Sequence, residues 1–447
     1  MLNMKRVIGN RPSPCKRLCL GAGWGKAAAM GYCIAIIGAG IGGLALAALL
    51  AEDGHDPTLF ERFDCPRPVG SGLVIQPVGQ AVMGLIGLCD DLCRLSSPIA
   101  HMLGHGAGGR RVLDVSYPGD APGRGIHRAA LFQLLWDRVA RLGLPVVTSA
   151  EVENAPLVGA GQRGSDQRIL RLRDGPEYGP FDLVVDASGA GSRISPLRAR
   201  PLGYGAIWGT VPWPSGTALT RTQLRQRYHG ASRMAGILPI GRLAGDATPL
   251  AAVFWSMPLA ELEAWPEASL AGWKAEVTAL WPEMAPFLEP IRRNADMTVA
   301  RYSHGTLGRP HAPGLVHIGD AAHRASPQLG QGANMALLDA LALSHALRAG
   351  LNEALPDYAA MRRWHVRIYQ GMSAAFTPMY QSGSRSLPVL RDLVLAPCSG
   401  LPGVRQALTR LVAGTMIPPL AGSHAPQPAS GQAAALRAAR AAPISRA

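Results

Sequence analysis

Three glycines near residue 40 have the spacing of a phosphate-binding turn. Gly38, Gly40 and Gly43 form the pattern G-x-G-x-x-G, directly before an apolar segment that predicts a helix over 44–53. Gly38 permits a tight turn, Gly40 removes a side chain so that backbone amides can reach a pyrophosphate, and Gly43 lets the helix pack closely on a sheet. The amino-terminal end of the helix then faces the negative charge of the phosphates. The spacing therefore predicts a site for a dinucleotide.

The residues around these glycines predict the elements that would position them. A short buried strand is expected at 33–37 and a second strand at 58–61. Glu61 ends the second strand, 18 residues after the last of the three glycines, where a carboxylate can accept hydrogen bonds from the hydroxyls of an adenosine ribose. Arg62 follows directly and is a further candidate for binding the cofactor. The uncharged run 31–51 is long enough to cross a bilayer, but the order strand, turn, helix and strand predicts a nucleotide-binding unit instead.

Two further motifs follow each other closely after residue 318. The segment from Gly319 to His323 reads G-D-A-A-H, and the segment from Gly330 to Asn334 reads G-Q-G-A-N. A long apolar helix is expected to continue from there until Gly350 stops it. Together with the first motif, these segments resemble the flavin-dependent aromatic hydroxylases of the p-hydroxybenzoate hydroxylase fold. The similarity extends from about residue 30 to about residue 349.

The resemblance assigns roles to residues of both later motifs. In the family, the aspartate of G-D-A-A-H, here Asp320, binds the ribityl chain of FAD, and the glycine-rich turn brings backbone amides to the pyrimidine edge of the isoalloxazine. An acceptor-only carboxylate suits a row of hydroxyls, and glycines let the backbone approach a flat ring closely. The turn corresponds here to Gly330, Gln331, Gly332 and Ala333.

Two other residues are assigned less directly. Arg128 resembles the family's arginine at the start of a helix, which contacts the flavin, and an exposed arginine is the alternative. His323 lies near the flavin by resemblance and is a weak candidate for an acid or base, while a structural hydrogen bond explains it equally well. The sequence therefore names no firm catalytic residue.

The resemblance also implies a reaction. The family consists of FAD-dependent monooxygenases that use NAD(P)H and O2, so we expect hydroxylation of an aromatic or polycyclic small molecule through a flavin C4a-hydroperoxide. One segment departs from the family pattern G-A-D-G-x-x-S, because the chain reads D-A-S-G-A-G-S from Asp186 to Ser192 and places Ser188 where the aspartate is usual. Halogenases and isoprenoid reductases of related fold share Asp-Ala-Ser-Gly, although the halogenase motif W-x-W-x-I-P is absent. A halogenase, an isoprenoid-type reductase or a non-catalytic flavin-binding protein is therefore the alternative.

The composition fits a globular enzyme of several units. The chain has 447 residues, of which 48% are hydrophobic and 17% charged, and this excludes an extended disordered protein. The net charge of +14 is concentrated at the ends, because six cations fall in 1–30 and three in 422–447, and neither segment contains an acid. Without a zinc spacing or a helix-turn-helix pattern, this charge does not predict nucleic-acid binding. The seven cysteines form neither a metal site nor a disulfide framework, so we expect a reduced cytoplasmic protein without a metal.

We therefore predict an α/β fold in which a Rossmann-type FAD-binding domain carries an inserted mixed-sheet substrate domain and a helical C-terminal region. The FAD-binding domain is expected at 30–200 and 301–350, and the substrate domain at 201–300, where six of the nine tryptophans lie. A helical cap is expected at 351–421. A disordered or non-native leader is expected at 1–29, and a disordered tail at 422–447. The expected partners are a small aromatic substrate and O2, with no membrane span, in a monomer or homodimer.

Overall fold

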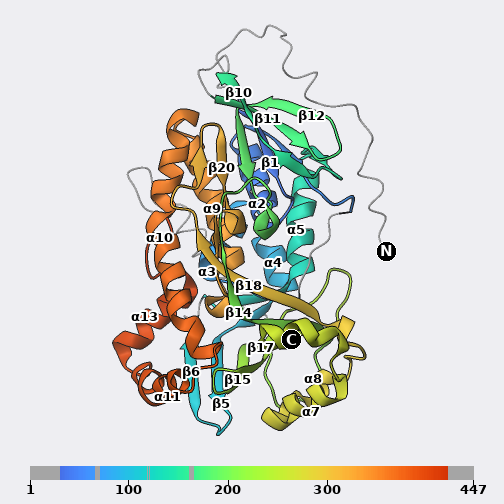
Figure 1. Cartoon of the computed structure of the whole chain (residues 1–447), viewed down its shortest axis with the longest axis vertical. Helices are drawn as coiled ribbons and strands as arrows, with labels where there is room; N and C mark the ends of the chain where they lie inside the picture. Colours follow the sequence, from blue (N-terminus) through green and yellow to red (C-terminus); the bar gives the residue numbers. More distant parts are fainter. Residues whose placement is uncertain (1–30, 66–70, 118, 120, 161–165, 421–447) are drawn as a thin grey trace, which may run out of the picture.

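The computed structural model describes residues 31–65, 71–117, 119, 121–160 and 166–420 of the chain. The leader expected at 1–29 and the tail expected at 422–447 lie outside the described residues. The described part is elongated, with a parallel sheet in the upper half and a larger sheet in the lower half (Figure 1).

A six-stranded sheet forms the centre of the upper half. Its order is β19-β20-β13-β1-β2-β8, and every neighbouring pair from β20 to β8 is parallel. The strands span His311–Ala312 (β19), Leu315–His317 (β20), Leu183–Asp186 (β13), Cys33–Ile37 (β1), Asp56–Phe60 (β2) and Val146–Val147 (β8). Because the chain continues from β1 to β2 on one side and reaches β13 on the other, the strand order reverses at β1. Ligands of α/β proteins bind at the carboxyl end of such a switch point. The sheet confirms the predicted Rossmann-type domain.

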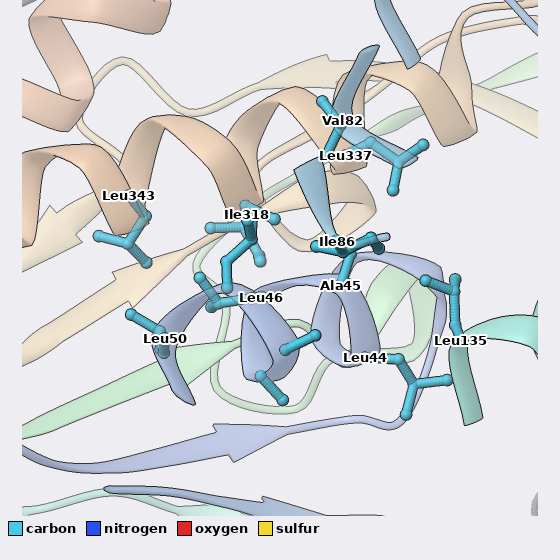
Figure 2. Packing of buried hydrophobic residues seen from close by; sticks show 14 of the residues in the cluster. Leu44, Ala45, Leu46, Leu50, Val82, Ile86, Leu135, Ile318, Leu337 and Leu343 are labelled. Carbon is cyan, nitrogen blue, oxygen red and sulfur yellow. The ribbon is translucent and has the colours of Figure 1, made fainter. Parts of the chain in front are cut away.

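Helix α2 (Ile41–Glu52) is buried on every side. Its residues 43–50 are all buried, because α9 (Gly332–Leu347) and α5 (Arg128–Arg141) both pack against it. Figure 2 shows Leu46 of α2 beside Ile318, beneath the residue Leu343 of α9. The apolar run 31–51 is thus a strand and an interior helix, as predicted. Among the described residues, none of the helices combines the length and the apolarity that a bilayer crossing demands.

An eight-stranded mixed sheet forms the lower half. Its order is β21-β18-β14-β17-β16-β15-β5-β6, and the pair β15 and β5 is parallel. The strands span His323–Arg324 (β21), Thr298–Thr306 (β18), Arg200–Pro212 (β14), Leu250–Pro258 (β17), Arg233–Pro239 (β16), Gln223–His229 (β15), His101–Gly106 (β5) and Arg111–Ser116 (β6). The sheet therefore takes strands both from 201–300, the predicted substrate domain, and from 101–116, which lies within the range predicted for the FAD-binding domain.

The two faces of this sheet have different coverings. On one face, α6 (Leu259–Ala264), α7 (Leu270–Leu280) and α8 (Ala285–Leu288) enclose a cluster that includes the buried Trp255, Trp265, Trp273 and Trp281. Tryptophans of this region therefore build the core. The other face carries a second cluster that includes Tyr117, Tyr228 and Phe254.

Smaller elements connect the two large sheets. A three-stranded antiparallel sheet lies between them, with β3 (Gly72–Ile75), β7 (Gly123–His127) and β4 (Ser97–Ile99), and α3 (Pro77–Leu85) and α4 (Cys89–Leu95) follow β3. A separate sheet at the upper end contains β9 (Val152–Asn154), β10 (Leu157–Ala160), β11 (Asp166–Leu172) and β12 (Glu177–Phe181).

The C-terminal region is helical. The long helix α10 (Leu351–Tyr380) packs along α9 and runs toward the lower sheet (Figure 1). It is followed by α11 (Ser386–Leu390), a π-helical turn (Arg391–Leu395), α12 (Ala396–Cys398) and α13 (Pro402–Ala413). The last two helices contact strand β6, so this region bridges both halves of the molecule.

Candidate cofactor-binding site

The glycine turn has the conformation that its sequence requires. Gly38 has a φ of +100° and its amide donates to the carbonyl of Phe60 at 2.7 Å, which joins the end of β1 to the end of β2. A Cβ at Gly43 would lie 2.0 Å from the carbonyl oxygen of Gly38, so only glycine lets α2 begin this close to the turn. A Cβ at Gly40 would meet no atom within 4 Å. The open space at Gly40 is the place where a phosphate can approach the backbone.

A cleft of about 470 Å³ opens at this turn, at the carboxyl ends of β1, β2 and β13. Its wall combines segments that are far apart in the sequence: 37–41, 60–63, 150–152, 187–191 and 193–194, together with Arg128, Phe132 and Asp320. The predicted residues Gly38, Gly40, Glu61, Arg62, Arg128 and Asp320 all line this cleft, whereas Gly43 supports the turn from behind.

Glu61 is held by the turn that it faces. Its Oε2 accepts a hydrogen bond from the amide of Ala39 at 2.9 Å, and its Oε1 accepts one from the amide of Phe63 at 3.1 Å. Each carboxylate oxygen can accept a second hydrogen bond. The carboxylate is thus fixed in orientation and still has acceptor capacity for the hydroxyls of a ribose.

Charged residues that the sequence analysis did not identify complete the rim of the cleft. Glu151 accepts from Arg193 at 2.7 Å and from Arg173 at 3.1 Å, and both Glu151 and Arg193 line the cleft. The guanidinium of Arg62 lies 4.6 Å from the centre of the Phe63 ring. The position of Glu151 just beyond β8, a parallel strand of the sheet, is the signal that could have indicated it.

Asp186 explains how the chain accommodates Ser188. The Asp186 carboxylate is fully buried and accepts from the hydroxyl of Ser188 at 2.5 Å, the hydroxyl of Ser192 at 2.6 Å and Nδ1 of His317 at 2.8 Å. Burial alone would raise the pKa of Asp186, but the hydrogen bonds from His317, Ser188 and Ser192 outweigh it and lower the pKa. The Ser188 side chain is therefore engaged inside the protein, and no carboxylate stands at position 188 of the cleft wall.

The loop with Asp320 is fixed by a second buried carboxylate. Asp339 of α9 accepts from the amide of Gly319 at 2.8 Å, from Nε2 of His323 at 2.7 Å and from Nε of Arg362 at 2.7 Å. Asp320 itself is exposed at the edge of the cleft. His323 does not line the cleft and is buried against Asp339, so the structure gives it the structural hydrogen bond that was its alternative role.

The glycine-rich turn before α9 is tied to strand β3. Gly330 has a φ of +60°, and Gly332 begins α9. The amide nitrogen of Asn334 donates to the carbonyls of Gly330 and Val74, both at 3.0 Å, and its oxygen accepts from the backbone amide of Gln76 at 2.8 Å. These bonds hold the turn, including Gln331 and Ala333, against the base of the three-stranded sheet.

A buried amide faces this turn without a partner. Gln76 is fully buried and its Oε1 accepts from the hydroxyl of Tyr117 at 2.6 Å, but its Nε2 has no hydrogen-bond partner among the described residues. That nitrogen lies 3.4 Å from the point where a Cβ of Gly330 would be. Unpaired buried donors are rare in folded proteins, because burial removes their hydrogen bonds to water without replacing them. The turn therefore fits the polar edge of a bound ring, and with the open Gly40 and the acceptor Glu61 the site fits FAD.

Comparison with known proteins agrees with this site. Residues 36–66 match the family described as NAD(P)-binding Rossmann-like domain, and residues 292–367 match the family described as FAD binding domain. The 3-amino-4-hydroxybenzoate 2-monooxygenase of Streptomyces cremeus is 29% identical over 74% of this chain and 82% of its own length. The salicylate hydroxylase of Pseudomonas putida is 29% identical over 75% of this chain and 82% of its own length.

Solved structures show the same fold. The structure of Klebsiella pneumoniae HpxO complexed with FAD and uric acid superposes with a TM-score of 0.71 at 19% identity, and covers 86% of this chain and 98% of HpxO. The tetrameric form of 2-methyl-3-hydroxypyridine-5-carboxylic acid oxygenase gives a TM-score of 0.70 at 21% identity, over 86% of this chain and 96% of the oxygenase.

The parallel sheet, the glycine turn at its switch point and the carboxylates along the cleft define an oxidoreductase that binds FAD. Within that class, the chain is similar to FAD-dependent aromatic hydroxylases, and the type of reaction that these similarities support is monooxygenation.

Two glycine variants separate packing from cofactor binding. Gly43→Ala forces a Cβ against the carbonyl of Gly38 and should lower the free energy of unfolding of the apoprotein by about 1–3 kcal/mol. Gly40→Ala meets no protein atom, so its unfolding midpoint should stay at the wild-type value, while the dissociation constant of FAD should rise about tenfold or more because the Cβ obstructs the phosphate. Denaturant unfolding and fluorescence titration with FAD measure the two quantities. Equal stability of both variants would contradict the assigned roles.

The exposed Asp320 and the engaged Ser188 should contribute unequally to FAD binding. Asp320→Ala removes a charged acceptor from the edge of the cleft and should weaken FAD binding by about tenfold to a hundredfold. Ser188→Ala should change the dissociation constant of FAD far less, because the Ser188 hydroxyl already bonds to Asp186. FAD titration of both apoproteins tests this, and comparable dissociation constants would show that Asp320 does not hold the cofactor.

The hydrogen bond to Asp186 also predicts which residues position 188 tolerates. Ser188→Asp replaces a donor by a carboxylate beside the buried Asp186, and should lower the free energy of unfolding by about 1–3 kcal/mol. Ser188→Asn has nearly the same shape and keeps a donor, so it serves as the matched control and should stay close to wild type. Denaturant unfolding of both variants at neutral pH decides the matter. If Ser188→Asp is as stable as Ser188→Asn, the Asp186 carboxylate does not require a donor there.

Proposed function

We propose that the protein uses NAD(P)H and O2 to hydroxylate an aromatic or polycyclic small molecule. The observation that carries this proposal is the cleft with Gly40, Glu61 and Asp320 along its wall, in a chain whose curated relatives are aromatic monooxygenases. When bound, FAD would accept electrons from NAD(P)H and activate O2. The protein must hold the cofactor, exclude water and position the substrate.

The binding of FAD is divided between residues of the cleft and the glycine-rich turn before α9, which does not line the cleft. Backbone amides at Gly40 and the start of α2 bind the pyrophosphate, Glu61 accepts from the adenosine ribose, and Asp320 accepts from the ribityl hydroxyls. The amino-terminal end of α9 at Gly332 favours the negative charge that a reduced ring carries. Arg128, whose side chain lines the cleft from the start of α5, contributes a further positive charge.

The substrate is proposed to bind at the edge of the buried cluster on the face of the lower sheet that carries Tyr117 and Phe254. Trp208 stacks on Phe254 with ring centres 4.4 Å apart, and its Nε1 donates to the hydroxyl of Tyr302 at 2.9 Å. Burial raises the pKa of Tyr302 to about 12, so its phenol stays protonated even at alkaline pH. Apolar aromatic side chains with neutral hydroxyls suit an aromatic ring. They distinguish little between rings that carry different substituents. This supports a ring-shaped substrate and leaves its identity to experiment.

We also propose that the protein works in the cytoplasm as a monomer or homodimer. Support for a reducing compartment comes from Cys65, Cys89, Cys93 and Cys398, which are free thiols in the described part of the chain. Light scattering of the purified protein measures its oligomeric state.

Oxygen incorporation tests the proposed reaction. With a panel of phenols and polycyclic aromatics, the FAD-loaded protein should oxidise NAD(P)H and place one atom of isotopically labelled O2 in the product, as measured by mass spectrometry. Anaerobic stopped flow should show faster flavin reduction when substrate is present. If the panel gives no labelled product while chloride is incorporated or an alkene is reduced, the halogenase or reductase alternative that Ser188 suggests replaces this proposal.

A further inference from the structure

An apolar surface lies at the lower end of the molecule, far from the cofactor cleft. Seven of the thirteen exposed large apolar side chains in the described part of the chain fall within the sixteen residues 389–404. They are Val389, Leu390, Leu393, Val394, Leu395, Leu401 and Val404, with exposed fractions between 38% and 58%. We call this set the apolar face. Contiguous exposed apolar patches on folded proteins mark contacts with a partner or a membrane.

The apolar face is fixed in place by a buried cation. Arg391 is 1% exposed, and its guanidinium lies 5.0 Å from the ring centre of Tyr228 and 5.1 Å from that of Tyr380. It also donates to the backbone carbonyls of Gly230 and Met379. Because Arg391 holds one side of the helical segment 386–398 against the protein, the side chains on the other side are directed into solvent.

Helical spacing places these side chains together. Val389 and Leu393 are four residues apart, as are Leu390 and Val394, so within one helical segment they share one side. A short turn at 399–401 connects α12 to α13, which lies near α11 in the lower left of Figure 1. Leucines and valines of the helical segment 386–398 and of the start of α13 are therefore exposed to solvent.

The charges around the apolar face are positive. Residues 386–404 contain two charged side chains, Arg391 and Asp392, and these pair with each other at 2.6 Å. Three exposed arginines, Arg385, Arg405 and Arg410, flank this segment.

A cleft of about 260 Å³ beside the apolar face adds to this charge. It is lined by Arg110, Arg111 and Arg405, together with Asp114 and Asp392, among other residues. Both acids already have partners, because Asp114 accepts from Arg111 at 2.7 Å and Asp392 accepts from Arg391. Arg110 and Arg405 are exposed, and Arg405 makes one long hydrogen bond, to the hydroxyl of Ser116 at 3.4 Å, so both arginines keep donors for an external anion.

We propose that the apolar face docks on a bilayer that contains anionic phospholipids. Its leucines and valines enter the boundary between headgroups and acyl chains, and the flanking arginines bind lipid phosphates. A second copy of the chain fits less well, because a two-fold contact would bring the same arginines together without an unpaired carboxylate to meet them. This inference concerns the place where the enzyme acts and is independent of the proposed substrate.

Vesicle sedimentation of the FAD-loaded protein tests the docking. The wild type should sediment with vesicles of phosphatidylglycerol and phosphatidylcholine, and much less with phosphatidylcholine alone. Leu393→Asp combined with Val394→Asp should lower the partition coefficient about tenfold or more, because both side chains would leave the lipid. Arg385→Glu combined with Arg405→Glu should abolish the preference for phosphatidylglycerol.

The matched control is at the opposite end of the molecule. Leu157 and Val158 of β10 are exposed by 47% and 51%, and Leu157→Asp with Val158→Asp adds the same charge there. This variant should bind vesicles like the wild type, although the net charge of +14 is reduced equally. FAD content and unfolding midpoint confirm that each variant is folded. If the aspartates at 393 and 394 prevent folding, Leu393→Asn with Val394→Asn carries the same test.

Three results would overturn the proposal. One is equal binding to both kinds of vesicle, and another is an equal loss of binding in the control variant. The third is a wild-type dimer, seen by light scattering without vesicle binding, that becomes monomeric when Leu393 and Val394 are replaced. In that case a second copy of the chain covers the apolar face.

Discussion

The Asp339 carboxylate is completely buried, and much of the cofactor site depends on how its charge is satisfied. Burial alone would raise the pKa of Asp339, but the charges and hydrogen bonds of His323 and Arg362 outweigh this and hold the pKa well below its usual range. A buried carboxylate that loses a partner is strongly destabilising. Its three donors come from the loop at Gly319, from β21 and from α10. The loop that presents Asp320 is therefore held by the C-terminal helix, more than forty residues further along the chain.

The same constraint makes the C-terminal region part of the site. Arg362 also donates to the carbonyl of Pro419 at 2.6 Å, which binds the end of the described chain to α10. On the other side of α9, Asn334 joins the glycine-rich turn to β3 and Gln76, and Gln76 joins Tyr117 and the lower sheet. The cofactor turn is thus fixed between both halves of the molecule by buried polar groups, which have definite directions. Apolar packing alone would allow the halves to slide against each other.

Local sequence was sufficient for the parts of the site that one segment builds. The turn around Gly40 and the strand directly before Glu61 could be predicted from spacing, because strand, turn, helix and strand follow one another within one short segment. Asp320, Arg128 and the turn at Gly330 came from the family resemblance. Glu151 and Arg193 were not predicted, because their place at the cleft depends on sheet order. The hydrogen bond of His323 could not be predicted either, because nothing in the segment around His323 indicates that Asp339 is its partner.

The fold was predictable in class but not in its domain limits. Alternating strands and helices around the glycine turn indicated the Rossmann-type sheet, and the apolar segments near 250–257 indicated a second sheet. That β5 pairs with β15, more than a hundred residues away, could not be read from either strand. The exposure of the leucines near residue 393 could not be predicted either, because a segment this apolar is normally expected in the protein core.

Helix α2 has a consequence for the order in which the protein is made. It has no polar side, and its covering helix α9 begins 280 residues after α2 ends, at Gly332. A nascent chain that stops before Gly332 has synthesised the glycine turn, every strand of both large sheets and α5, yet α2 still lacks α9, the second helix that covers it. The nucleotide-binding half is therefore complete only when α9 has been synthesised, 280 residues after the end of α2. During that interval the side of segment 41–52 that α9 will cover is exposed apolar surface, and such surface is prone to aggregation.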